Sequence, residues 1–137
     1  MPKTVLTVCA TCADTSKPGE AGLGGGGKLR SLLQTQLVDH PFRDRIEISS
    51  IRCLMGCTRG CVITVSGRGK MQYILGDLSP ELRLVEQVLD FAALYDTSVT
   101  GVTANHEWPP LMAIHFLARI PPFDPVEGDW NDDGCNL

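Results

Sequence analysis

Five cysteines lie in two short segments of the chain. The first segment is CATC at residues 9–12, and the second is CLMGCTRGC at residues 53–61. The cysteines are Cys9, Cys12, Cys53, Cys57 and Cys61. Thiolates repel one another unless a cation neutralises them, and soft sulfur ligands select zinc, copper(I) or an iron–sulfur cluster. The two segments therefore predict a metal or cluster site if the fold brings them together.

Two glycines interrupt the second segment, Gly56 and Gly60. A helix over residues 51–61 would place the three cysteines on one face, because residues four apart stack there. Each glycine, however, costs about 1 kcal/mol in a helix interior and permits backbone turns that other residues resist. We therefore expect a loop, whose backbone N–H groups can approach sulfur atoms as they do in iron–sulfur proteins.

The composition narrows the classes of partner. The 137 residues carry 12 basic and 16 acidic side chains, giving a net charge of −4. We expect neither nucleic acid nor a membrane as a partner, and the acidic balance favours a basic redox partner. The first residues, MPKTVLTV, lack the features of a signal peptide, and no apolar run approaches the length of a membrane span. A cytoplasmic protein is expected, in which reduced thiols serve metal binding or redox chemistry rather than disulfides.

The apolar pattern predicts a small α/β (α+β) fold, in which helices flank a single mixed sheet. Alternating β-branched residues predict strands, and leucine or valine at helical spacing predicts two amphipathic helices. The expected strands are residues 3–8, 45–51, 62–66 and 70–75, and the expected helices are residues 28–38 and 80–95. The second helix is predicted to have Ser79 as N-cap and Pro80 at its first position.

The remaining segments carry weaker patterns. Residues 13–27 predict a loop, and residues 110–118 predict a short helix bounded by prolines. We assign residues 1–122 to a single domain and residues 123–137 to an acidic tail that we expect to be mobile.

The expected elements indicate where the cysteines meet. Cys9 and Cys12 follow the first strand, and the second cysteine segment follows the second strand. If these two strands are parallel neighbours joined by the first helix, both cysteine groups emerge at the same edge of the sheet.

With these elements in place, the sequence resembles a bacterial domain-of-unknown-function family of predicted metal-binding proteins, related to the thioredoxin-like [2Fe-2S] ferredoxins. The resemblance covers roughly residues 5–122. Its motifs are VCATC at 8–12, RCLMGCTRGC at 52–61, GKMQYILGDL at 69–78 and ARIPP at 118–122. It implies a thioredoxin-like fold, a [2Fe-2S] cluster, one-electron transfer rather than enzymatic catalysis, and a homodimer as one expected assembly.

The same resemblance assigns ligands to individual cysteines. Cys9 matches the ligand that ends the first strand, and Cys53 and Cys57 match the pair that follows the second. The usual second ligand, about ten residues after the first, has no counterpart here, so Cys12 takes its place. Cys61 stands where the ferredoxins usually have proline, and it could be the fourth ligand, a spare thiol or a residue behind the ligands.

Several alternatives remain open on the residues alone. A C-x₂-C pair combined with a C-x₃-C pair also suits zinc, in a structural or interaction module or in a metal carrier. Cys9 and Cys12 could instead form a dithiol redox motif, although the residues that follow are a poor helix start. The GLGGGGK segment at 22–28 nearly matches a phosphate-binding loop but lacks its hydroxyl residue. The histidines are isolated, and Cys135 in the tail is expected to have no role at the site.

Overall fold

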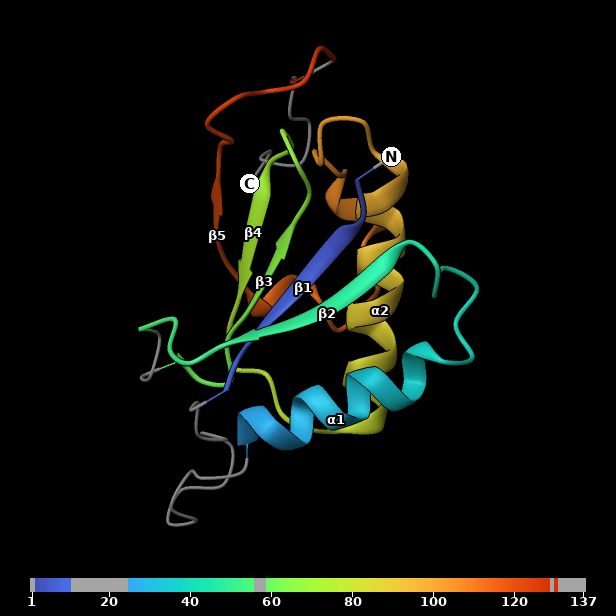
Figure 1. Cartoon of the computed structure of the whole chain (residues 1–137), viewed down its shortest axis with the longest axis vertical. Coiled ribbons are helices and arrows are strands. Elements are labelled where there is room, and N and C mark those ends of the chain that lie inside the picture. The colour runs from blue at the N-terminus through green and yellow to red at the C-terminus, as the bar shows by residue number, and fades with distance from the viewer. Residues whose placement is uncertain (1, 11–24, 56–58, 129, 131–137) are drawn as a thin grey trace.

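The computed structural model describes residues 2–10, 25–55, 59–128 and 130 (Figure 1). Within these residues the chain forms one five-stranded mixed sheet with strand order β2-β1-β3-β4-β5. The strands are β1 (Thr4–Cys9), β2 (Ile46–Ile51), β3 (Ile63–Ser66), β4 (Gln72–Leu75) and β5 (Phe116–Ile120). The α-helices are α1 (Gly25–Leu37) and α2 (Leu82–Thr97).

The first two strands are parallel neighbours, which was the condition for both cysteine groups to emerge at the same edge of the sheet. They pair from Thr4 opposite Ile46 to Cys9 opposite Ile51, with α1 as the connection between them. The other pairs, β1 with β3, β3 with β4, and β4 with β5, are antiparallel. The carboxyl ends of β1 and β2 therefore lie side by side at one edge of the sheet.

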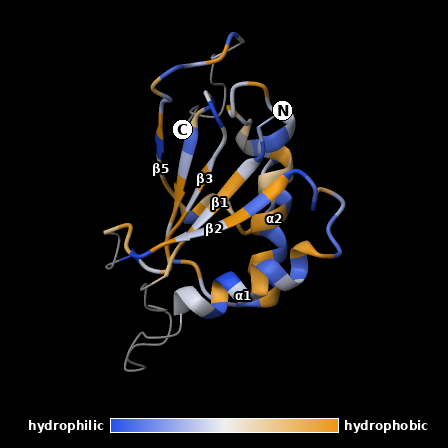
Figure 2. Cartoon of the chain, viewed as in Figure 1, coloured by the Kyte–Doolittle hydropathy of each residue, from blue (hydrophilic) through white to orange (hydrophobic). Residues whose placement is uncertain are grey.

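The core lies between the sheet and the two helices. Both helices contact β1 and β2 as well as each other, so they pack on the same face of the sheet (Figure 1). Leu6 and Val8 of β1 are fully buried there, and so are Leu29 of α1 and Val88 of α2. Figure 2 shows the hydrophobic residues gathered in the strands and in bands along the helices. This burial fixes the strands that carry the cysteine segments.

The α-helices begin at positions other than those predicted. The first starts at Gly25, so three glycines expected in a loop form its first turn. The second starts at Leu82, and its N-cap is Glu81, which makes no side-chain capping hydrogen bond. The predicted roles of Ser79 and Pro80 were therefore wrong, because local capping patterns do not include the packing that decides where a helix starts.

The segment predicted as a short helix over residues 110–118 does not form an α-helix. It contains a turn and a single 3₁₀ turn at Ala113–His115, and then enters β5. Phe116 pairs with Leu75, and Ile120 pairs with Gln72. No residue of β5 is fully buried, so this edge strand lacks the alternation that identifies a strand from sequence. In the part of the chain described here, no helix is long and apolar enough to cross a membrane.

Candidate functional site

The two cysteine segments begin at the edge of the sheet where β1 and β2 end. Cys9 is the last residue of β1 and lies opposite Ile51. The Ala10 N–H donates to the Ile51 carbonyl at 2.8 Å, so the segment that follows β1 still pairs with the end of β2. Cys53 follows Ile51 by two residues, which brings it to the same edge. Cys12 and Cys57 lie outside the described residues.

Two consecutive backbone N–H groups of the second segment donate to sulfur atoms. The Leu54 N–H lies 3.4 Å from Cys9 Sγ, and the Met55 N–H lies 3.3 Å from Cys53 Sγ. Met55 has a φ of 59°, an uncommon conformation for a residue other than glycine. Its loop thus directs two N–H donors at two sulfurs, one at the end of β1 and one just after β2, an arrangement that stabilises negative charge on sulfur.

The start of α1 lies directly against Cys9. A Cβ atom at Gly26 would come within 2.1 Å of the Cys9 carbonyl oxygen, so only glycine allows this approach. At Gly27, by contrast, an added Cβ would meet nothing within 4 Å. Because the positive end of the helix dipole is at its N-terminus, this packing also favours anionic sulfurs at this edge of the sheet. The run of glycines is visible in the sequence, but the sequence does not show which glycine contacts Cys9.

Cys61 lies on the other side of the segment, in the core. Its side chain is 0% exposed. Its backbone exchanges two hydrogen bonds with Leu78, at 3.0 Å from the Cys61 N–H and 3.1 Å to the Cys61 carbonyl. Among the described residues, Cys9, Cys53 and Cys61 do not come together as a set of three metal ligands.

An ion pair fixes the chain just before Cys61. Arg59 Nε donates to Asp77 Oδ2 at 2.7 Å, and a second guanidinium nitrogen contacts the same oxygen. The hydrogen bond from Arg59 lowers the pKa of the Asp77 carboxyl. Burial opposes this effect, and the charges of Arg59 and His115 lower the pKa further. The Asp77 N–H also donates to the Arg59 carbonyl. The sequence alone gave no signal for this pair, since the two residues lie in different loops.

The histidines take no part in this edge of the sheet. His40 contacts Asp90 at 3.1 Å, and His115 Nδ1 lies 2.9 Å from the Gly76 carbonyl oxygen. His106 is exposed. Across the described ranges, no group of three or more His, Cys, Asp and Glu residues is arranged to hold a metal ion. Cys135 lies outside those ranges.

Comparison with known proteins identifies a family and a fold. A family model described as "Protein of unknown function (DUF1636)" matches residues 6–122. No curated protein sequence matches the chain significantly. A solved structure of a thioredoxin-like [2Fe-2S] ferredoxin from Aquifex aeolicus is similar, with a TM-score of 0.58 and 15% sequence identity over 90% of this chain and 98% of that one. This similarity confirms the thioredoxin-like fold expected from the sequence.

Proposed function

We propose that this chain, which belongs to the DUF1636 family of proteins of unknown function, is a ferredoxin-like one-electron carrier that holds one [2Fe-2S] cluster. The proposed ligands are Cys9, Cys12, Cys53 and Cys57. The cluster would lie where β1 and β2 end, and it would supply a redox couple that changes by a single electron. The fold shared with a thioredoxin-like [2Fe-2S] ferredoxin is consistent with this proposal.

The pair of N–H···S hydrogen bonds is the observation that carries the proposal. Leu54 and Met55 donate to the sulfurs of Cys9 and Cys53, one from each cysteine segment. Hydrogen bonds to cluster sulfurs are one of the means by which a protein sets reduction potential. The chemistry of the donor set also fits, because thiolates at this edge receive backbone dipoles and the N-terminus of α1, and no Asp or Glu is among the buried residues of the described ranges.

The surface position of the loop supports electron transfer to another protein. Met55, which donates to Cys53, has a side chain that is 87% exposed. Ile51, at the end of β2, is 46% exposed. A partner could therefore dock on apolar side chains directly beside the cysteines, which suits a carrier that gives and receives electrons by contact.

Cys61 is assigned a packing role in this proposal. Its side chain is fully buried, as is that of Cys9, but the N–H groups of Leu54 and Met55 donate to Cys9 and Cys53, and the Cys61 backbone is paired to Leu78 on both sides. The assignment gives Cys61 a different role from Cys12, the proposed ligand that lies three residues after Cys9 in the sequence. It also gives the two cysteines opposite expected behaviour on substitution.

Metal analysis and a visible absorption spectrum of protein purified without oxygen test the proposal. We expect a red-brown protein with about two irons and two labile sulfides. Cys12→Ser and Cys53→Ser should lose the colour, whereas Cys61→Ser and the matched control Cys135→Ser should keep it. About one zinc and no colour would replace the cluster with a structural or carrier site. A metal-free protein with a reversible Cys9–Cys12 disulfide would instead favour the dithiol function.

A further inference from the structure

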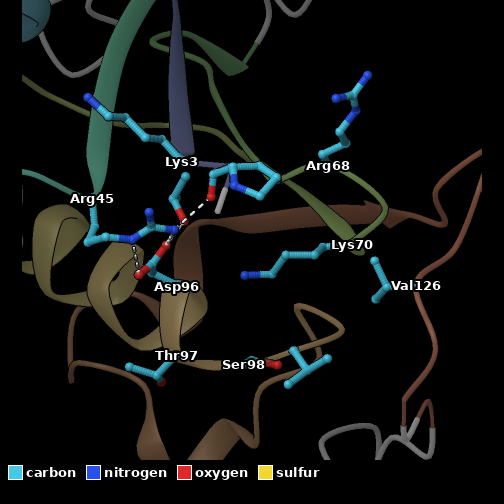
Figure 3. Close-up of a pocket in the computed structure, with 12 residues that line it drawn as sticks. Lys3, Arg45, Arg68, Lys70, Asp96, Thr97, Ser98 and Val126 are labelled. Atoms are coloured by element: carbon cyan, nitrogen blue, oxygen red, sulfur yellow. Dashed lines mark hydrogen bonds and ion pairs between the residues drawn. The ribbon is translucent and has the colours of Figure 1, made fainter.

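A charged cavity lies at the other end of the sheet, about 17 Å from Cys9 along β1. Its volume is about 240 Å³. The residues before β1 and β2, the turn between β3 and β4, and the last turn of α2 surround it (Figures 1 and 3). We define the cationic pocket by its charged residues, which are Lys3, Arg45, Arg68, Lys70 and Asp96. Four of these five side chains are basic, in a chain whose net charge is −4.

The single carboxylate of the cationic pocket is already neutralised. Asp96 accepts from Arg45 Nε and from an Arg45 terminal nitrogen, both at 3.2 Å. The Thr4 hydroxyl donates to it at 2.8 Å. The Asp96 side chain is only 10% exposed, so this pair is part of the wall. The positive charges of Lys3, Arg68 and Lys70 remain without a carboxylate partner among the residues that the structure describes.

Lys70 is the basic residue that points into the cavity (Figure 3). Its Nζ donates to the Tyr95 carbonyl at 2.8 Å and lies 4.2 Å from the centre of the Tyr95 ring. Burial lowers the pKa of the Lys70 ammonium, the nearby charge of Asp96 opposes this effect, and the smaller effect of Arg45 lowers the pKa again. An anion that enters the cavity would add to the stabilisation that Asp96 already gives this half-buried ammonium.

Lys3 and Arg68 lie at the rim rather than on the floor. Figure 3 shows both side chains extending outward from the cavity. Both residues are exposed, so their side chains can rotate toward a ligand at little energetic cost. They also line an adjoining, more open hollow of about 440 Å³, to which Glu47 contributes one carboxylate. The pocket thus offers a ligand one cation inside, Lys70, and two at its rim, Lys3 and Arg68.

We propose that the cationic pocket binds a small molecule that carries a phosphate group. Lysine and arginine N–H groups match phosphate oxygens, and a surplus of three positive charges suits a ligand with more than one negative charge. A volume of about 240 Å³ exceeds the roughly 30 Å³ of one water but lies below the usual range for large ligands. The site therefore suits free phosphate or a short phosphate ester.

Calorimetric titration of the full chain, purified with its native metal content, tests this proposal. The probes are inorganic phosphate and glycerol phosphate, with sodium chloride at the same ionic strength as the reference. We expect saturable binding of at least one phosphate probe. Lys70→Met, which retains the apolar part of the side chain, should weaken binding by about tenfold or more. The control Arg83→Gln removes an exposed arginine at the start of α2 and should bind like the wild type.

A second variant and a second readout keep the test decisive. The double variant of Lys3→Gln and Arg68→Gln changes only exposed side chains, and it should weaken binding even if Lys70→Met folds poorly. Phosphate should shift the amide NMR signals of residues 67–70 and 96–98 but not those of residues 83–86, at the opposite end of α2. Heat signals equal to those of chloride would overturn the proposal. Wild-type affinity in folded Lys70→Met and in the double variant would also overturn it.

Discussion

Where β1 and β2 end, backbone groups point at two sulfurs, whereas where they begin, charged side chains line a cavity (Figure 3). The cysteine end depends on one glycine contact and on one residue with positive φ. The cationic end depends on one ion pair, Arg45 with Asp96. The same two strands thus support one site built by chain geometry and another built by side-chain charge. Substitutions at the two ends should therefore act through different physical causes.

The largest loss of stability is expected at the cationic end. Asp96→Ala leaves Arg45 without its carboxylate and the Thr4 hydroxyl without its acceptor. Breaking such a pair costs about 3–5 kcal/mol when it is fully buried, and we expect about 2–3 kcal/mol here because Arg45 is partly exposed. Urea unfolding measures the change. The control Asp90→Ala removes an exposed partner of His40 and should change stability by less than about 1 kcal/mol.

A matched pair of glycine substitutions examines the cysteine end. Gly26→Ala pushes a methyl group against the Cys9 carbonyl and should lower stability by about 1–3 kcal/mol. Gly27→Ala meets open space and should raise stability by about 0.5–1 kcal/mol through helix propensity. Urea unfolding of both variants gives the comparison. Equal effects at the two positions would contradict a close contact between α1 and Cys9.

Cys61→Ala separates packing from ligation. Removal of a fully buried sulfur leaves a small cavity, so we expect a loss of about 1 kcal/mol in unfolding free energy. The visible spectrum and iron content should remain those of the wild type. A colourless variant with unchanged stability would make Cys61 a ligand and remove the packing assignment.

The smallest expected effect concerns pH and the pair of Arg59 with Asp77. The folded-state pKa of Asp77 is lowered, so its stabilisation is present above the unfolded carboxyl pKa of about 3.9 and is lost as pH falls through the folded value. Asp77→Asn is the suitable variant, because asparagine tolerates the φ of 55° at this position. The difference in stability between the wild type and Asp77→Asn should shrink as the pH falls below 3.9. A difference that does not depend on pH would contradict the ion pair.

Part of this arrangement could be predicted from the sequence, because strands and amphipathic helices leave local patterns of apolar residues. Alternation in residues 3–8 and 45–51 and the leucine spacing of the first helix were sufficient to predict two strands joined by a helix. The structure adds that these strands are parallel neighbours, which brings the two cysteine segments to one edge. The start of α1 at Gly25 was not predicted, because it depends on contact with Cys9. β5 was missed because an edge strand stabilised by pairing with β4 shows little alternation.

The two sites also differ in how far the sequence could predict them. Cysteines are rare enough that their spacing alone identified the candidate ligands, and the structure adds the N–H donors and the buried position of Cys61. Lys70, Arg45 and Asp96 are ordinary residues in separate segments, and no local pattern indicates that they share a cavity. Their arrangement depends on the tertiary fold and could not be predicted from sequence.

Reductive titration of anaerobically purified protein tests the central claim most directly, with absorption and electron paramagnetic resonance as readouts. The proposal predicts that about one electron per chain bleaches the visible bands and produces a paramagnetic signal, in protein that contains about two irons. Cys53→Ser should lose both the bands and the signal. A colourless wild type that contains zinc and accepts no electrons would contradict the proposal.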